Sequence, residues 1–112
     1  MSKEPAKVIR FKDIKFEPRF EYGDVCSIGV VCGGDLGTEL GTGFARMTKA
    51  RIPWTVKYDE VLTVIEGTLK VHAGGKVHEL RPRDSMWIPN GTALVYEAEN
   101  ALVHYAIHPV NF

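Results

Sequence analysis

PWTVKYDEVLTVIEG, residues 53–67, and RDSMWIPNG, residues 83–91, are the two segments that decide the fold of this chain. Within the first segment, residues 60–65 alternate so that Glu60 shares one face of an extended strand with two aliphatic side chains. Gly67 follows at a position typical of a tight turn, since glycine permits a positive φ angle. The second segment ends in a similar way, with a proline and a glycine. The two segments therefore predict β-strands that end in turns.

The rest of the chain shows the same pattern of short alternating or β-branched stretches separated by turn residues. The predicted strands are Val8–Phe11, Phe16–Tyr22, Val25–Cys32, Thr42–Lys49, Glu60–Ile65, Gly67–Ala73, Lys76–Leu80, Ser85–Ile88, Leu94–Ala98 and Leu102–Ile107. Gly33-Gly34-Asp35 predicts a turn and Gly74-Gly75 a two-residue hairpin. About ten short strands predict a sandwich, a jelly roll or a closed barrel. We expect one domain over residues 1–112, with a short N-terminal arm at about residues 1–7.

The charge balance excludes several classes of partner. Fourteen basic residues match 14 acidic residues, so the formal net charge is zero. Nucleic acid and anionic membrane surfaces both require a basic excess, and neither is expected as a partner. The N-terminal residues MSKEPAKVIRF contain no long apolar run, and no apolar stretch is long enough to span a bilayer. The expected location is therefore the cytoplasm.

Segments 53–67 and 83–91 resemble the two motifs of the cupin superfamily, small β-barrels that often hold a divalent metal. The family pattern has a glycine, two histidines one residue apart, a glutamate, and a glycine seven residues later. Its second part has an aspartate, a proline, a glycine and a third histidine. Here Glu60 and Gly67 keep their spacing, and Asp84, Pro89 and Gly91 keep theirs. The resemblance implies an all-β, RmlC-like double-stranded β-helix, which is a jelly-roll barrel.

The histidines of the pattern are missing. Pro53 and Thr55, or Trp54 and Val56 in the alternative register, stand where the paired histidines would be, and Leu94 replaces the third. The standard motif therefore predicts no metal site, because only its glutamate is kept. A divalent metal held by a non-standard ligand set stays open as an alternative, and the cofactor is otherwise unknown.

Among the cupins, the chain looks closest to the ethanolamine-utilisation EutQ-like cupins, over roughly residues 43–110. The matching residues are Pro53, Trp54, Thr55, Tyr58, Asp59, Glu60, Glu66, Gly67, Leu69, Val71, Asp84, Met86, Ile88, Pro89, Gly91, Tyr105 and Pro109. Arg83 departs from the pattern, because the family has glycine there. The resemblance implies a homodimer of poorly defined biochemistry with a link to ethanolamine utilisation. The acetate kinase activity associated with some members is not expected here, because the sequence has no phosphate-binding element.

Glu60 and Tyr58 are the candidate catalytic residues. A carboxylate on an apolar strand face must be paired, hydrogen-bonded, metal-bound or protonated. Glu60 is therefore either an acid/base or ligand group in the barrel mouth, or a structural carboxylate bonded to the backbone or to a nearby arginine or tyrosine. Tyr58 lies two residues earlier, so both side chains should point to the same side. Its hydroxyl could donate a hydrogen bond to a substrate or simply pack.

Four further residues complete the candidate site. Trp54 and Tyr96 should line the mouth, where Trp54 stacks on a ligand or caps the core. The predicted hairpin places His78 on the same face as Val71, where it could replace a missing ligand or be an ordinary core or surface histidine. The same two interpretations apply to His104. Both histidines are weak candidates for a metal site that includes Glu60 and Tyr58.

The leading hypothesis is a cupin that binds a small polar or carboxylate ligand in the barrel mouth, lined by Trp54, Tyr58, Glu60, Tyr96 and His78. The first alternative is a metal-dependent enzyme with a non-standard ligand set. The second is a non-catalytic assembly or regulatory module. In that case aliphatic side chains, Leu94 among them, fill the barrel. Whether the chain is an enzyme is left open by its residues.

Overall fold

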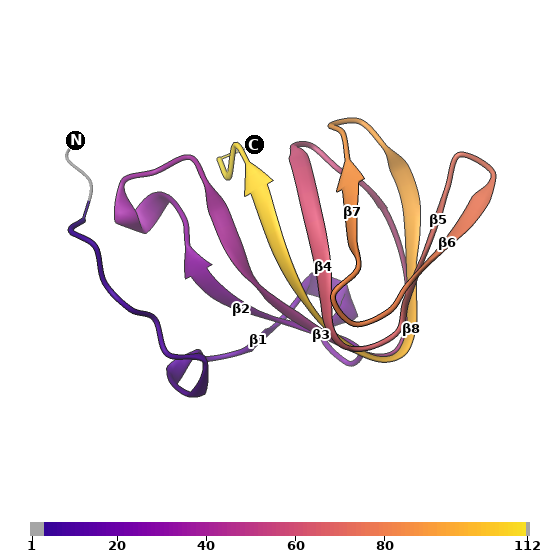
Figure 1. Cartoon of the computed structure of the whole chain (residues 1–112), viewed down its shortest axis with the longest axis horizontal. Helices are drawn as coiled ribbons and strands as arrows, with labels where there is room; N and C mark the ends of the chain where they lie inside the picture. The colour runs from indigo at the N-terminus through magenta and orange to yellow at the C-terminus, as the bar shows by residue number, and fades with distance from the viewer. Residues whose placement is uncertain (1–3, 112) are drawn as a thin grey trace.

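Two long antiparallel strands, β3 and β8, run through the whole fold (Figure 1). The structure, a computed structural model, describes residues 4–111. Its strands are β1 (Glu17–Pro18), β2 (Cys26–Cys32), β3 (Gly41–Thr55), β4 (Asp59–Gly67), β5 (Leu69–Ala73), β6 (Lys76–Leu80), β7 (Ser85–Ile88) and β8 (Ala93–His108). The described 3₁₀ helices are η1 (Phe11–Asp13), η2 (Phe20–Tyr22) and η3 (Gly34–Leu36). No helix within residues 4–111 is long and apolar enough to cross a membrane. The all-β class predicted from the sequence is confirmed.

The described strands hydrogen-bond into one sheet in the order β1-β2-β3-β8-β4-β7, and β5 joins β8 to β6. β8 is central because its N-terminal part pairs with β5, its C-terminal part pairs with β4, and β3 pairs along almost its whole length. The sheet curves strongly along β3 and β8, so that its two halves face each other (Figure 1). Within residues 4–111 it does not close into a ring, since β1 and β7 end the strand order. The curved sheet therefore encloses an interior while its edges stay apart.

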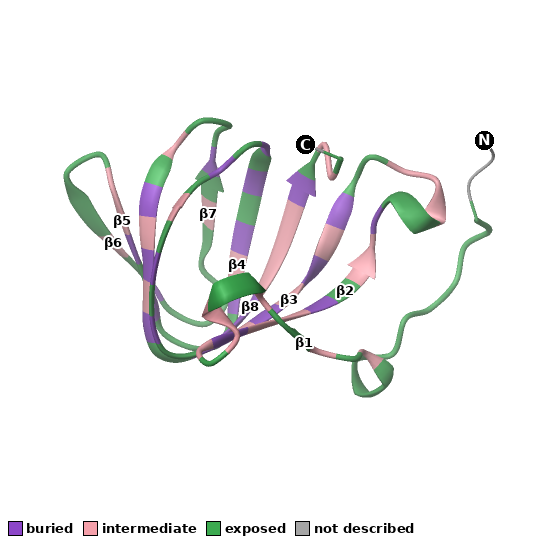
Figure 2. Cartoon of the chain, turned by 180° about the vertical axis from the view of Figure 1, so that it is seen from behind, coloured by how far each residue is buried: buried purple, intermediate pink, exposed green. Residues whose placement is uncertain are grey.

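The interior is filled by alternate side chains of the long strands. Along β4, Glu60, Leu62 and Val64 are buried, whereas their neighbours Val61 and Ile65 are exposed. Figure 2 shows similar alternation along β3 and β8. The largest fully buried side chains are Leu69, Ile88, Val56, Val64, Val71 and Val103. Burial of each such aliphatic side chain stabilises the fold by about 1.5–3 kcal/mol, so this core fixes the strand register and holds Glu60 on the inner face.

Two predicted N-terminal strands are largely wrong. Val8–Phe11 forms no strand, because no described segment pairs with it and Phe11 begins η1. Of Phe16–Tyr22, only Glu17–Pro18 is a strand. The extended run ends there because Phe20 adopts a φ of 47°, outside the β region. The predicted arm at about residues 1–7 includes residues 1–3, which lie outside the described part of the chain.

The predicted strands Leu94–Ala98 and Leu102–Ile107 are in fact one strand, β8. The polar residues between them resemble a turn in the sequence, yet Asn100 pairs with Thr48 of β3, so the ladder continues. The predicted hairpin turn at Gly74-Gly75 is confirmed between β5 and β6.

Candidate functional site

A cavity of about 350 Å³ opens inside the curved sheet. Strands β2, β3, β4 and β8 and the segment around η2 form its walls. Its polar and aromatic lining residues are Arg19, Phe20, Tyr22, Trp54, Tyr58, Glu60, Tyr96 and Tyr105. Its other walls are mostly aliphatic or sulfur-containing side chains, including Cys26, Ala45, Met47, Ile52, Leu62 and Val103. The structure thus brings together four of the five predicted ligand-binding residues, all except His78.

Glu60 is the buried carboxyl group of this cavity. It lies on β4 between Ile88 of β7 and Ile107 of β8, and only 5% of its surface is exposed. The Tyr96 hydroxyl donates a hydrogen bond of 2.9 Å to Glu60 Oε1. Burial raises the pKa of Glu60 to about 7, although the Tyr96 hydrogen bond and the positive charge of Arg19 both act to lower it. A group with this pKa can both donate and accept a proton near neutral pH.

Tyr58 and Trp54 form a second polar contact on the cavity wall. The Trp54 indole N–H donates a hydrogen bond of 3.1 Å to the Tyr58 hydroxyl. Tyr58 is buried, and this burial together with the negative charge of Glu60 raises the pKa of its hydroxyl. The prediction that Tyr58 and Glu60 point to the same side is confirmed, since both line the cavity. Their chemical roles stay predictions.

Replacing Tyr96 by phenylalanine should raise the pKa of Glu60 by about 1 to 2 pH units, because the ionised carboxylate loses its hydrogen-bond donor. The measurement is a pH titration followed by the ¹³C chemical shift of the Glu60 carboxyl. Tyr105→Phe is the matched control. Tyr105 lines the same cavity, but within residues 4–111 no hydrogen bond joins its hydroxyl to Glu60. A Glu60 pKa that is unchanged or lower in Tyr96→Phe would contradict the structure.

Arg19 is a cavity residue that sequence reasoning missed. Its guanidinium lies 4.1 Å from the centre of the Phe20 ring and 5.8 Å from that of Trp54. Within residues 4–111 it forms no ion pair. Its charge nevertheless acts on the cavity, where it lowers the pKa values of Glu60 and Tyr58. Arg19 lies in an irregular segment just before η2, where no periodicity could have indicated which way it points.

Tyr105 was also missed, although a signal was present. It alternates with Val103 and Ile107 along β8, and all three line the cavity. Its cross-strand partner in β4 is Leu62. Burial raises the pKa of Tyr105. The period of two that predicted the inner face of β4 would have identified Tyr105 if applied to β8.

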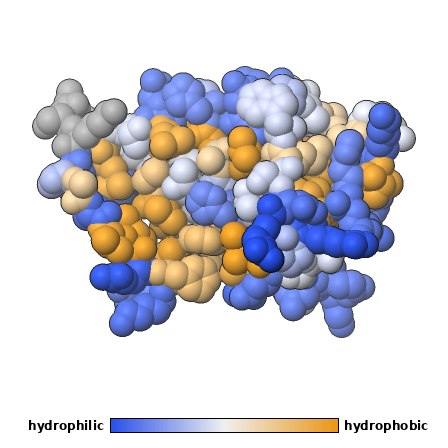
Figure 3. Space-filling view, in the orientation of Figure 1, coloured by the Kyte–Doolittle hydropathy of each residue, from blue (hydrophilic) through white to orange (hydrophobic). Residues whose placement is uncertain are grey.

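A neighbouring cavity of about 630 Å³ lies between the N-terminal segment and β2. Arg19 and Phe20 line both cavities, so they form part of the wall between them. Its lining combines hydrophobic side chains, of which Val8 and Phe20 are each 70% exposed, with charged ones. The charged lining residues are Arg10, Asp13, Lys15, Glu17 and Arg19. Figure 3 shows hydrophobic surface gathered at this end of the molecule.

The predicted histidines do not reach Glu60. His78 pairs with Val71, which pairs with Tyr96, so the predicted face is right. Val71 is completely buried between the two, however, and His78 does not line the cavity. His104 contacts Phe44 edge to face, with ring centres 5.0 Å apart, and alternates with the cavity-lining residues of β8.

The positions of His78 and His104 leave the cavity without the histidine ligands that a metal site with Glu60 would need. Within residues 4–111 no three His, Cys, Asp or Glu side chains gather closely enough to hold a metal ion. The cavity offers the Glu60 carboxyl and tyrosine hydroxyls, and no imidazole is among its lining residues. This donor set does not fit the usual preference of catalytic transition metals for several imidazole or carboxylate ligands.

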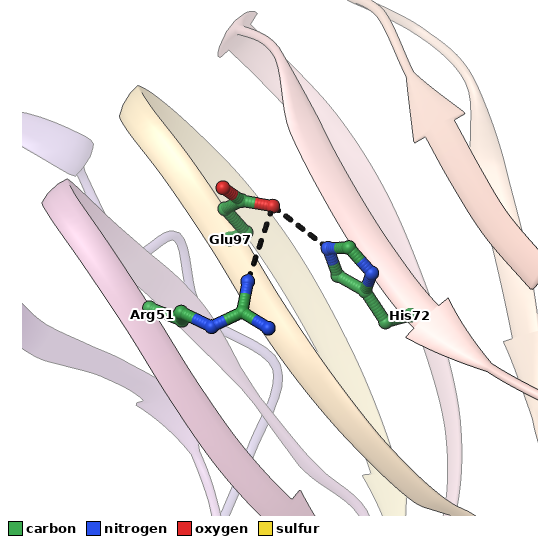
Figure 4. Close-up of polar contacts among 3 residues, drawn as sticks. All are labelled: Arg51, His72 and Glu97. Carbon is green, nitrogen blue, oxygen red and sulfur yellow. Dashed lines mark hydrogen bonds and ion pairs between the residues drawn. The ribbon is translucent and has the colours of Figure 1, made fainter.

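Arg51, His72 and Glu97 form a separate polar cluster on the outside of the sheet (Figure 4). His72 Nε2 lies 2.7 Å and Arg51 Nη1 3.5 Å from Glu97 Oε1. The hydrogen bond from His72 is the main cause of a lowered pKa of Glu97. The cluster joins β3, β8 and β5 across their outer face, because Glu97 alternates with the inward-facing Tyr96. We interpret it as a brace between strands.

Comparison with known proteins supports this description. The family model "Ethanolamine utilisation protein EutQ" matches residues 4–112. Acetate kinase EutQ of Escherichia coli (strain K12) is 31% identical over 109 residues, which are 95% of this chain and 46% of that protein. The chain spans about half the length of the curated relatives it matches.

Solved structures give the same relationship at the level of the fold. The crystal structure of a putative ethanolamine utilization protein Q from Salmonella typhimurium LT2 has a TM-score of 0.88 and 27% identity, over 95% of this chain and 88% of that chain. An RmlC-like cupin from Shewanella frigidimarina has a TM-score of 0.77 at 15% identity, over 97% of this chain and 95% of that one. The RmlC-like cupin fold expected from the sequence is therefore confirmed.

Proposed function

Because the chain belongs to the EutQ family of ethanolamine-utilisation proteins, we propose that its cavity binds a small polar molecule with a carboxylate group. The single observation that supports this most is the position of Arg19. Among the described residues that line the cavity of about 350 Å³, Arg19 is the one cationic side chain, and it has no carboxylate partner within residues 4–111. Guanidinium groups bind carboxylates through two parallel hydrogen bonds. A carboxylate ligand would supply the missing partner.

The size and walls of the cavity are consistent with a small ligand. Its volume lies near the lower end of the roughly 300–1,000 Å³ typical of small-molecule sites. The lining is mostly apolar, with a few polar groups that could orient a ligand, as in most such sites. Curated relatives are named acetate kinase, and acetate is a carboxylate. The chain spans only about half of those proteins, so the proposal extends to carboxylate binding and not to phosphoryl transfer.

Glu60 and Tyr58 are the proposed acid/base and hydrogen-bond donor if the bound molecule is converted. Glu60 has a pKa of about 7, which suits proton transfer at neutral pH. Tyr58 lines the same cavity on the same side. A homodimer and a cytoplasmic location, expected from the sequence, stay predictions.

The test is calorimetric titration of the protein with acetate, propionate and butyrate at low ionic strength. We expect saturable binding of at least one of these acids by the wild type and a loss of roughly tenfold or more in affinity in Arg19→Gln, since a charge-assisted hydrogen-bond pair is removed. Arg51→Gln is the matched control, because it removes a guanidinium on the outside of the sheet and should leave binding unchanged. No saturable binding, or equal losses in the two variants, would overturn the proposal.

A further inference from the structure

Among the described residues, one carboxyl oxygen of Glu60 has no hydrogen-bond or ion-pair partner. Tyr96 donates its hydrogen bond to Oε1, and within residues 4–111 no hydrogen bond or ion pair involves Oε2. No buried side-chain polar atom of the described residues lacks a partner, so Oε2 is open to the cavity. A buried carboxylate that no cation pairs is costly for the folded protein. A ligand that provides a positive charge would pair it.

The walls near Glu60 favour the same kind of ligand. Trp54, Tyr58, Tyr96 and Tyr105 all line the cavity with it. The faces of aromatic rings are negative, and such rings around a carboxylate attract an ammonium group more strongly when water is excluded. An anion placed beside ionised Glu60 would be repelled by its negative charge.

Glu60 and Arg19, the two charged lining residues among those described, are buried to different extents. Glu60 is buried, whereas Arg19 is partly exposed and stacks on the strongly exposed Phe20 ring. Within residues 4–111 they form no ion pair with each other, so their charges are more than 4 Å apart. The cavity is therefore negative at its inner end and positive at its mouth, and a molecule with charges of both signs would complement it.

We propose that the ligand is a small amino carboxylate whose ammonium group pairs with Glu60 while its carboxylate pairs with Arg19. This proposal rests on the proposed function, because it adds an amine to the carboxylate ligand. The amine end would donate hydrogen bonds to Oε2 and lie against the rings of Tyr58 and Tyr96. The carboxylate end would accept hydrogen bonds from the N–H edge of the Arg19 guanidinium, which forms no ion pair within residues 4–111.

The proposal predicts a characteristic dependence of binding on pH. Ammonium binding requires ionised Glu60, so affinity should rise with pH up to the Glu60 pKa of about 7 and then level off. Tyr58, Tyr96, Tyr105 and Cys26 also face the cavity, and burial raises the pKa of each. None of these four should therefore lose its proton between pH 5.5 and pH 8, which leaves Glu60 as the titrating group.

The experiment compares three probes of matched length, 4-aminobutyrate, butyrate and butylamine, by calorimetric titration of the full chain at pH 5.5 and pH 8. Glycine and 3-aminopropionate test shorter spacings of the two charges. We expect the best amino acid to bind at least tenfold more tightly than its matched acid at pH 8, and to lose affinity by roughly 30-fold at pH 5.5. The affinity for butyrate should instead fall from pH 5.5 to pH 8, because ionised Glu60 repels the carboxylate of butyrate. Glu60→Gln should abolish the preference for the amino acid and leave the acid bound.

The other outcomes separate the two proposals. If the amino acid and its matched acid bind equally tightly, and the affinity for both falls as pH rises, the ammonium proposal is wrong. The proposed function would still stand. Butylamine binding as tightly as the amino acid, with no binding of butyrate, would overturn the amino carboxylate and the proposed function together. No binding of any probe by the wild type would also overturn both. The pH comparison uses wild-type protein alone, so it holds even if a variant fails to fold.

Discussion

Replacing Glu60 by glutamine is expected to raise the free energy of unfolding by about 3 kcal/mol at pH 8 and by less than about 1 kcal/mol at pH 5. The pKa of Glu60 is about 7 in the folded protein, against an ordinary value of 4.5. The folded state therefore holds the proton more tightly than the unfolded chain, and stability falls as pH rises from about 4.5 to 7. Since each pH unit corresponds to about 1.4 kcal/mol, the burial of the ionised group costs about 3 kcal/mol above pH 7. Glutamine is neutral and keeps an oxygen that accepts the Tyr96 hydrogen bond.

Urea unfolding of the wild type and the variant at pH 5, 6, 7 and 8 measures this effect. Glu97→Gln is the control of opposite sign, because the pKa of Glu97 is lowered by His72 in the folded state. A carboxylate of that kind stabilises the fold above its ordinary pKa, so its removal should not stabilise the protein at pH 8. A stability difference between wild type and Glu60→Gln that does not change with pH would refute the assignment of Glu60 as a desolvated acid.

Replacing Gly67 by alanine is expected to destabilise the fold by about 3 kcal/mol or more. Gly67 ends β4 with a φ of 77°, and a Cβ atom there would collide with the backbone carbonyl oxygen of Asn100 in β8. A left-handed conformation costs a non-glycine residue about 1–2 kcal/mol, and the collision adds a forced shift of packed backbone.

Gly74→Ala is the matched control for this change. Gly74 has a similar φ of 62°, but apart from Gly74 and its two chain neighbours no heavy atom of the described residues lies within 4 Å of the added Cβ. Gly74→Ala should lower the free energy of unfolding only by the cost of the left-handed backbone conformation, about 1–2 kcal/mol. Urea unfolding measures both variants, and equal losses would show that the contact with β8 is unimportant. The steric limit gives a physical reason for the glycine that follows the glutamate in the sequence motif.

The inner face of β4 could be predicted from the sequence because a period of two is a local property. Glu60 and Tyr58 point inward for that reason, and both line the cavity. The register of the β5–β6 hairpin was predictable too, and it places His78 on the correct face. The distance of His78 from Glu60 was not predictable, because it depends on where β5 joins β8, and that is a property of the whole sheet.

Arg19 shows the other limit of the sequence. The chain reaches Arg19 through a two-residue strand and leaves it through a residue with positive φ, so no repeating pattern indicates its direction. Only the folding of β3, β4 and β8 creates the cavity that it lines. Sequence analysis could therefore predict the site residues that lie on regular strands. It could not predict Arg19, which lies on an irregular segment.

The central place of β8 has a consequence for synthesis of the protein on the ribosome. β3 ends at residue 55 and its main partner, β8, begins at residue 93. β4 and β5 each pair with β8 as well, in addition to β7 and β6 respectively. At about 5–20 residues per second, roughly 2–8 s pass between the emergence of the two strands. During that time one long edge of β3 is available to other nascent chains. Slowing translation between residues 55 and 93 should therefore increase aggregation, whereas slowing it before residue 41, where β3 begins, should not.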